Sequence, residues 1–327
     1  MKVKQSWLRL SAKAFAAGAT LALLTCPAHA QDAKTIHVIV PLLAGAGTDV
    51  VTRTFTNALS QRLGQPIVVE NKAGGATMLG ANYVVKSAPD GTTLLAATTS
   101  TLSVLPNVQK PPYDTLKDLV PIVAFSVSPF VFGVAAESRF KTLAELIAAA
   151  RAEPGKLTFG SSGTGTLTHM VVELLSVVAR ANFAHIPYKG VTGAYTDVIG
   201  GRIDLLADAP ASMLPQVRGG RMRALVVTAP QRLPTFPGVP TVAELGLVGA
   251  EADFTTGLLA PAGTPVAVIA RLQAESLKVA QSAEFHAYLA TQGYEPLAAD
   301  GAEFGRIIRA GLAKWERVVR ERNIKVE

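Results

Sequence analysis

The feature that most constrains the fold is a short apolar run that opens into a loop of small residues and then into helical spacing. The run covers residues 36–41, and Val51, Phe55, Leu59 and Leu63 recur every four residues beyond the loop. β-Branched apolar runs favour strands, whereas a four-residue recurrence places side chains on one face of a helix. The sequence therefore predicts a strand, a tight loop and a helix in succession.

The same unit recurs along the chain. A strand is expected at residues 67–70 and a helix at about residues 78–87, with a glycine-rich loop between them. A third copy combines a strand at residues 157–161 with a helix at residues 168–180. Strands separated by helices are typical of α/β layering, in which ligands bind beyond the carboxyl ends of parallel strands. Three loops rich in Gly, Ser and Thr are expected at such ends.

Further strands are predicted from short apolar runs elsewhere. They cover residues 94–99, 183–188, 203–207 and 224–228, whereas residues 265–324 are expected to be almost entirely helical. The whole pattern predicts an α/β protein and leaves little room for disorder.

Two segments have the composition of boundaries between domains. Residues 126–129 and 248–256 interrupt the alternation of strands and helices. We therefore expect two α/β domains joined by two crossover segments, with the C-terminal helices returning to the first domain. Domain I is predicted to comprise residues 31–127 plus 254–327, and domain II residues 128–253. A ligand cleft between the domains would be lined by loops from both.

The first thirty residues have the pattern of an export signal. Lys2, Lys4 and Arg9 form a positively charged start, residues 14–24 form an apolar run, and an A-x-A pattern ends at Ala30. This order is typical of cleavable secretory signals, and the apolar run is too short for a comfortable membrane span. The sequence thus predicts a signal peptide over residues 1–30, cleavage after Ala30 and a soluble periplasmic protein.

Cys26 is the single cysteine of the chain. A lipoprotein signal would place a lipidated cysteine here, but Thr25 is a poor residue for the preceding position. Cleavage after Ala30 removes Cys26, so the mature chain is expected to contain neither a disulfide nor a cysteine nucleophile. Its stability must then come from core burial, for which roughly 297 residues suffice.

The charge distribution argues against nucleic-acid binding. The formal net charge is +7, but four of the basic residues lie in the predicted signal, and only 6% of the residues are aromatic. Nucleic-acid-binding surfaces combine clustered Lys and Arg with stacking rings, and no such block occurs in this sequence. No nucleic-acid partner is predicted.

The nucleotide-binding motifs are incomplete. The Walker A motif needs Gly-Lys followed by Ser or Thr, and this sequence has no such tripeptide. The dinucleotide fingerprint G-x-G-x-x-G is only partly met, because Gly45 and Gly47 are followed by Val50 where the third glycine belongs. No cofactor is therefore predicted.

Catalytic and metal-binding motifs are incomplete as well. The nucleophile elbow G-x-S-x-G fails at Thr164, which stands where the last glycine belongs. The histidines beyond the predicted signal, His37, His169, His185 and His286, show no metal-ligand spacing. No catalytic residue and no metal site are predicted. His169 lies in the first turn of its helix, where it either packs or caps locally or contacts a ligand.

The chemistry of the three loops favours a small carboxylate. Backbone N–H groups and a helix N-terminus attract negative charge, each contact contributing about 0.3–1 kcal/mol. Further hydrogen-bond donors are the hydroxyls at Thr48, Thr77, Ser161, Ser162 and Thr166. Asp49 is expected to cap the helix that begins beside it. The alternative is that Asp49 contacts a hydroxyl or ammonium group of the ligand.

Seven short motifs in register over the predicted mature chain carry a family resemblance. Together they resemble the periplasmic solute-binding proteins of tripartite tricarboxylate transporters, the Bug receptors. The first matches the family's V-P-F-x-x-G-G-G-x-D loop, the second its V-E-N-[KR]-P-G loop and the fourth its G-S-x-G-x-G loop. The motifs occupy residues 40–49, 69–74, 89–94, 160–165, 187–190, 240–244 and 260–265.

The resemblance implies a two-lobed periplasmic binding protein fold of type II that closes on its ligand. It also implies a carboxylate site formed by the first two loops and the G-S-x-G-x-G loop, partly through ordered waters. Carried over residue by residue, the substrate-binding positions are Leu42, Gly45, Gly47, Thr48, Asp49, Ala76, Thr77, Ser161, Gly163, Thr166, His169 and Asp208.

Several positions depart from the family pattern. Leu42 and Leu43 replace the usual Phe-Pro, Ala46 replaces the middle glycine of its loop, and Ala209 replaces an Asn often found after Asp208. A Trp-Phe pair is replaced by threonines at residues 255–256, and Ala73 and residues 77–78 also differ. These changes remove aromatic and amide contacts to the usual ligand, whereas capture of an anion by backbone groups does not depend on them.

The favoured hypothesis is a periplasmic receptor, not an enzyme, that captures a small organic carboxylate for a membrane permease of the tripartite tricarboxylate type. A monomer is expected, as is usual for this scaffold. One alternative is an exported hydrolase or isomerase that uses His169 with Asp49 or Asp208. Another is a ligand-sensing receptor for a signalling partner. The sequence does not identify the carboxylate.

Overall fold

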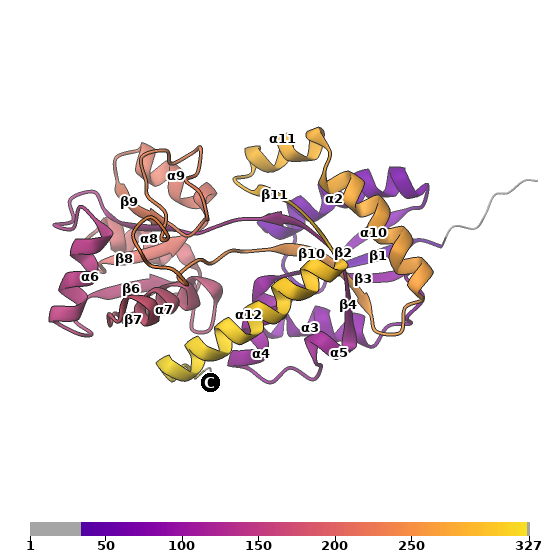
Figure 1. Ribbon diagram of the computed structural model, residues 1–327, viewed down its shortest axis with the longest axis horizontal. Coiled ribbons are helices and arrows are strands. Elements are labelled where there is room, and N and C mark those ends of the chain that lie inside the picture. The colour runs from indigo at the N-terminus through magenta and orange to yellow at the C-terminus, as the bar shows by residue number, and fades with distance from the viewer. Residues whose placement is uncertain (1–33, 326–327) are drawn as a thin grey trace, which may run out of the picture. The chain divides into compact units, whose positions relative to one another are not determined.

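The computed structural model describes residues 34–325. The predicted signal peptide, its cleavage after Ala30 and Cys26 lie outside the described residues and stay predictions. None of the helices within the described range has the length and apolarity needed to span a membrane. The strands form two separate sheets, each flanked by helices (Figure 1).

The first sheet has six strands in the order β11-β4-β10-β3-β1-β2. Strands β2, β1 and β3 are parallel, whereas β10 runs antiparallel to both β3 and β4, and β11 runs antiparallel to β4. The strand bounds are β1 Ile36–Val40, β2 Ile67–Asn71, β3 Thr93–Thr98, β4 Leu119–Val127, β10 Thr256–Pro261 and β11 Glu295–Asp300.

The second sheet has five strands in the order β7-β6-β8-β5-β9. Strand β6 is parallel to β7 and β8, and β5 is antiparallel to β8 and β9. The chain passes from the first sheet to the second between β4 and β5 and returns between β9 and β10. The bounds are β5 Val131–Ala135, β6 Thr158–Ser161, β7 Ala184–Pro187, β8 Leu205–Asp208 and β9 Met222–Val227.

Helices connect most of the parallel strands and cover both sheets (Figure 1). Short helices, including a π-helical turn labelled η2, follow β3 and precede β4. The bounds are α2 Gly47–Leu63, η1 Gly75–Thr77, α3 Met78–Val85, η2 Ser100–Val104, α4 Leu105–Val108, α5 Thr115–Asp118, α6 Leu143–Ala152, α7 Leu167–Ala179, α8 Val191–Ile199, α9 Pro210–Arg218, α10 Val266–Ala280, α11 Ala283–Thr291 and α12 Gly301–Arg322.

The two sheets contain the segments that the sequence assigned to two domains. The six-stranded sheet takes its strands from residues 36–127 and 256–300, and the five-stranded sheet from residues 131–227. The two-sheet α/β fold is therefore confirmed. The boundaries of the predicted domains stay predictions, because residues Thr35–Glu327 form one compact unit.

Two expectations about local structure were wrong. The segment predicted to be almost entirely helical contains strand β11, whose small residues Ala298 and Ala299 give a weak alternating pattern. The first helix begins at Gly47 with Ala46 as its N-cap residue, and no side chain caps it, so neither Thr48 nor Asp49 is the cap. The sheets are also mixed, because β5 and β10 directly follow chain crossings without an intervening helix.

The predicted helix face is buried against the first sheet. Val51, Phe55 and Leu59 of α2 are fully buried. The Phe55 ring stacks on Phe125 of β4 with centroids 4.2 Å apart. Full burial of such a side chain contributes about 1.5–3 kcal/mol. The four-residue recurrence was therefore a correct indicator of the core.

Helix α12 contributes to the cores beneath both sheets. Its N-terminal half buries Phe304 and Ile308 in a cluster with residues of the first sheet. Its C-terminal half buries Trp315 and Val318 among residues of the second sheet and α7. Figure 1 shows α12, in yellow, running from β4 toward α7. Helices α10 and α11 pack on elements of the first sheet, whereas α12 packs on elements of both sheets.

We expect Gly257→Ala to destabilise the protein by about 1–3 kcal/mol, the usual effect of an overpacked core. A Cβ at this position of β10 would overlap the Val123 carbonyl and the Phe304 ring. Gly238→Ala is the matched control, because its Cβ would meet nothing within 4 Å. Urea denaturation of both variants measures the difference, and equal midpoints would contradict this account of the packing.

Candidate functional site

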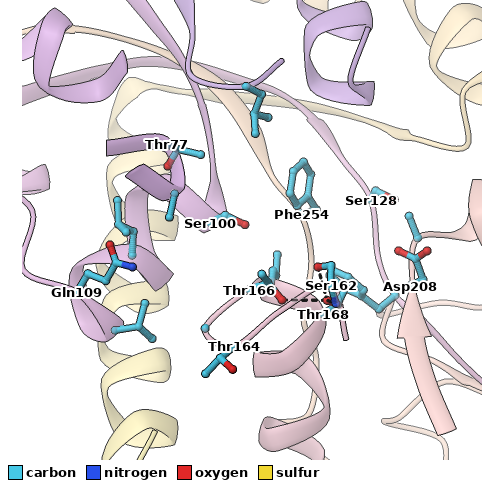
Figure 2. Close-up of a pocket in the computed structure, with 18 of the residues that line it drawn as sticks. Thr77, Ser100, Gln109, Ser128, Ser162, Thr164, Thr166, Thr168, Asp208 and Phe254 are labelled. Carbon is cyan, nitrogen blue, oxygen red and sulfur yellow. Dashed lines mark hydrogen bonds between the residues drawn. The ribbon is translucent and has the colours of Figure 1, made fainter. Parts of the chain in front are cut away.

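The three predicted loops meet at one cavity of about 380 Å³. Each loop follows a strand, β1, β2 or β6, and precedes a helix, so the carboxyl ends of these strands all contribute. Figure 2 shows side chains from these loops facing residues of η2, α4 and the chain crossings. The cavity is lined by Leu42, Ala76, Thr77, Ser100, Leu105, Val108, Gln109, Ser128, Phe130, Ser162, Thr164, Gly165, Thr166, Leu167, Thr168, Asp208, Ala209, Phe254 and Tyr294.

The first loop is held from behind by Asp49. This buried carboxylate accepts hydrogen bonds from the Gly45 N–H at 2.9 Å, from Arg53 Nε at 3.0 Å and from Asn71 Nδ2 at 2.9 Å. Burial alone would raise the pKa of Asp49, but these three donors hold it below its ordinary value. Asp49 is thus saturated by the protein and does not line the cavity.

Asn71, at the end of β2, ties the first loop to the second. Its Nδ2 also donates to the Leu42 carbonyl at 3.1 Å, and its Oδ1 accepts from Arg53 Nη2 at 2.7 Å. Neither Arg53 nor Asn71 was predicted as a site residue, although Asn71 belongs to the V-E-N-K motif. The signal in the sequence for Asn71 was its position at the end of a strand, where a side-chain amide can bond to the backbone of neighbouring loops.

The second loop contains backbone conformations that are unusual for its residues. Ala76 has φ of 51° and Thr77 has φ of 83°, in the left-handed region that non-glycine residues avoid. The hydroxyl oxygen of Thr77 is buried and has no hydrogen-bond partner in the described part of the chain. Strain of this kind concentrates at ligand sites, where it fixes the direction of a side chain.

The third loop carries a cluster of hydroxyl groups at the start of α7. The Thr166 hydroxyl donates to the Gly163 carbonyl at 2.7 Å, and the Thr168 hydroxyl accepts the Ser162 N–H at 3.0 Å. The Thr168 hydroxyl also lies 2.8 Å from the Ser162 hydroxyl and 3.1 Å from that of Thr166. Figure 2 shows these three side chains side by side at the cavity wall.

Behind this loop lies a buried polar chain that contains two stacked histidines. The Gly165 N–H donates to His169 Nδ1 at 3.1 Å, which makes Nδ1 an acceptor and leaves the ring proton on Nε2. Nε2 lies 3.5 Å from Oε1 of Glu173, and Glu173 pairs with Arg322 at the end of α12. His169 therefore supports the loop from the core and does not line the cavity.

His185, which is half-buried, completes this group. Its ring lies 3.8 Å from that of His169, centroid to centroid, and its Nε2 is 2.7 Å from the Ser161 hydroxyl. Burial, followed by the neighbouring His169, lowers the pKa of His185 to about 4. Ser161 is fully buried, so its hydroxyl serves His185 and the Gly163 backbone.

Further wall residues come from the end of β8 and from the loop before β11. Asp208 ends β8 and accepts a hydrogen bond from Tyr195 Oη at 3.2 Å, and burial raises its pKa. Tyr294 lies against Gly47, where a Cβ would come within 2.7 Å of its Oη. Gly47 thus leaves room for Tyr294, and Tyr294, not Gly47, faces the cavity.

The structure brings some predicted site residues to the cavity and places others behind it. Those that line it are Leu42, Ala76, Thr77, Thr166 and Asp208. Those that do not are Gly45, Gly47, Thr48, Asp49, Ser161, Gly163 and His169.

Sequence reasoning missed the side chains that come from the crossings and from the helices after β3. Ser128 and Phe254 lie on the two crossings and exchange backbone hydrogen bonds of 3.2 Å and 2.7 Å. The crossings had been recognised only as boundaries, because they lack the Gly and Thr pattern of a loop that binds an anion. The other missed lining residues include Ser100, Leu105, Val108, Gln109, Phe130 and Tyr294.

Charged groups are scarce around the cavity. Among the described lining residues, Asp208 is the only one with a carboxyl group, and none is a Lys, Arg or His. Residues 34–325 contain no group of three His, Cys, Asp or Glu side chains placed to hold a metal ion. The site thus offers hydroxyl, amide and backbone N–H donors beside apolar surface.

The free energy of unfolding should decrease as the pH falls from about 6.5 toward about 4. The pKa of His185 is lower in the folded protein than in the unfolded chain. The contribution of His185 to the free energy of unfolding is therefore complete above the pKa in the unfolded chain, and it is lost as the pH falls to the pKa in the folded protein. Allowing for partial solvent screening, we expect a loss of up to about 2 kcal/mol.

His185→Gln should remove this component of the pH dependence, whereas the control His286→Gln should retain it. His286 bonds to the Ala280 carbonyl, far along the chain from this group. Chemical denaturation at several pH values provides the measurement. Parallel pH profiles for wild type and His185→Gln would show that His185 is not responsible.

Comparison with known proteins identifies relatives over nearly the whole chain. A family model described as "Tripartite tricarboxylate transporter family receptor" matches residues 51–324. The protein BugT from Bordetella pertussis is 33% identical over 305 residues, which cover 92% of this chain and 93% of the relative.

Solved structures show the same similarity. A Rhodopseudomonas palustris protein solved with adipate is 28% identical, with a TM-score of 0.76 over 90% of this chain and 99% of that chain. MatC from Rhodopseudomonas palustris, solved with bound malate, is 28% identical, with a TM-score of 0.72 over 87% and 98% of the two chains. These similarities confirm the predicted family resemblance and the periplasmic binding protein fold.

Proposed function

The chain belongs to the tripartite tricarboxylate transporter receptor family, and we propose that it captures a small organic carboxylate in the cavity described above. The captured ligand is then delivered to the membrane permease of a transporter of this type. The family name supports the permease as partner, and the relatives solved with adipate and malate support the ligand class.

The observation that carries the proposal is a set of donors without protein partners. The Thr77 hydroxyl is buried and unpartnered, and the Ser100 and Thr164 side chains have no hydrogen bond within residues 34–325. The N–H groups of Leu167 and Thr168 belong to the first turn of α7, where no intrahelical acceptor exists. Donors of this kind at a helix N-terminus suit a carboxylate.

Release of an unchanged ligand is favoured over catalysis. Both ring nitrogens of His169 face protein groups, Gly165 and Glu173, and Asp49 is occupied by Arg53. Neither residue lines the cavity, so the pairing of His169 with Asp49 offers no base to a bound molecule. A role as receptor for a signalling partner uses the same binding step and differs only in the protein that receives the ligand.

A periplasmic location is part of the proposal. The predicted signal over residues 1–30 supports export, and a similar solved structure, 26% identical with a TM-score of 0.73, is the periplasmic binding protein BugD. An exported receptor meets its ligand before the permease does, which is the order that delivery requires.

A thermal-shift screen with mono-, di- and tricarboxylates tests the function. A ligand at 100-fold its Kd should add about 2.7 kcal/mol to the free energy of unfolding. Ser100→Ala and Thr164→Ala should each weaken binding about tenfold, since each removes a donor to a charged group. Thr196→Ala is the control, because its exposed hydroxyl bonds only to the Thr192 carbonyl of α8.

Two results would contradict the proposal. One is that no carboxylate shifts the melting transition at millimolar concentration. The other is that the best ligand is chemically consumed by a substoichiometric amount of protein, which would establish an enzyme. Ligand recovered unchanged after denaturation of the complex, in one-to-one ratio, is the expected outcome.

A further inference from the structure

Building on the proposed function, we propose that the cavity selects an acid with one carboxylate and a compact apolar body, such as an aromatic or alicyclic monocarboxylate, over di- and tricarboxylates. The carboxylate lies at the hydroxyl cluster of α7, and the apolar body lies against the chain crossings and α4. Four observations carry this inference: the absence of a basic lining residue, the position of Asp208, the apolar wall and the way that wall is held.

The first observation is the lack of a cation for a second carboxylate. No Lys, Arg or His is found among the described residues that line the cavity. Arg53, behind the first loop, is already bonded to Asp49 and Asn71. Lys72 pairs with Glu70 and lies over the Tyr83 ring. One carboxylate can be held by N–H and hydroxyl groups, but a second would be desolvated without compensation.

The second observation is the buried carboxyl group at the end of β8. Asp208 lines the cavity at the N-terminus of α9 and is nearly fully buried. It is bonded to Tyr195, and its neighbour Ala209 begins a helix whose first residue, Pro210, has no N–H to offer an anion. A carboxylate directed toward this wall would find a buried carboxyl group and no cation to offset its desolvation, which disfavours diacids that span the cavity.

The third observation is the apolar character of the wall opposite α7. Leu105 and Val108 come from α4, Phe130 and Phe254 from the two crossings, and Leu42 from the first loop. Figure 2 shows the Phe254 ring projecting into the space between Ser100 and Ser128. An aromatic ring presented in this way offers its face to another flat or compact apolar group.

The fourth observation is that this wall is fixed in place. Ser128 and Phe254 exchange two backbone hydrogen bonds, and the Phe130 N–H donates to the Thr228 hydroxyl at 2.8 Å. The residues that flank Phe254 turn to the other side of the extended segment, where the Thr255 hydroxyl bonds to Asp253. Phe254 is therefore held toward the cavity by its backbone, which makes it a specificity-determining residue.

Isothermal titration of the purified protein tests the selectivity. The probes are benzoate and cyclohexanecarboxylate as apolar monoacids, malate, adipate and citrate as polyacids, and benzamide as an uncharged analogue. At least one apolar monoacid should bind at least 100-fold more tightly than every polyacid, a ratio of Kd values that corresponds to about 2.8 kcal/mol. Benzamide should bind at least tenfold more weakly than benzoate, because it lacks the anion that the α7 donors attract.

Two variants examine the wall itself. Val108→Thr keeps the shape of the side chain but adds a hydroxyl, and should weaken binding of the preferred monoacid about tenfold. The matched control Val248→Thr changes an exposed side chain away from the cavity and should leave binding unchanged. Val108→Arg supplies the missing cation and should raise the affinity for adipate at least tenfold while lowering that for benzoate.

The outcomes separate this inference from the proposed function. If malate, adipate or citrate binds as tightly as the monoacids, the selectivity is wrong and the carboxylate receptor stands. If benzamide binds as tightly as benzoate, or if no acid binds, the proposed function fails and the selectivity with it. An unchanged affinity of Val108→Thr for the best monoacid, with an unchanged fold by circular dichroism, would overturn the assignment of the apolar wall.

Discussion

The pairing of the two chain crossings is the interaction on which the rest of the site depends. Ser128 and Phe254 exchange two backbone hydrogen bonds, and Thr228 links the same region by accepting from Phe130 and donating to the Ala252 carbonyl. Each crossing would be an unsupported extended segment without the other. Because they are joined, the segments that connect the sheets also form one wall of the cavity.

Helix α12 provides the second connection between the sheets, and it reaches the ligand loops through polar contacts. Phe304 is buried with the first sheet and Trp315 with the second. At the end of the helix, Arg322 pairs with Glu173, which lies beside the His169 that accepts the Gly165 N–H. Rigid packing along α12 therefore positions α7, and with it the hydroxyl cluster that faces the cavity.

Sequence patterns were sufficient to locate the three loops but not to decide which of their atoms face the ligand. Glycine and hydroxyl residues after a strand indicate an anion-binding turn whatever their orientation. The orientation of a side chain depends on backbone angles and tertiary contacts. Thr77 has a positive φ, and Asp49 is bonded to Arg53 behind the first loop instead of facing the cavity. Phe130 and Phe254 carried no local signal, since their role arises only when distant segments pair.

The polar groups at this site fall into two kinds, according to whether the protein completes their hydrogen bonds. Groups behind the loops, such as Asp49 and His169, have their hydrogen bonds completed by the protein. Groups in front, such as Thr77, Ser100 and Thr164, are held by the same loops and helices but have no partner within residues 34–325. The conformational entropy of these donors is lost when the chain folds, not when the ligand binds. A carboxylate therefore meets donors that are already ordered.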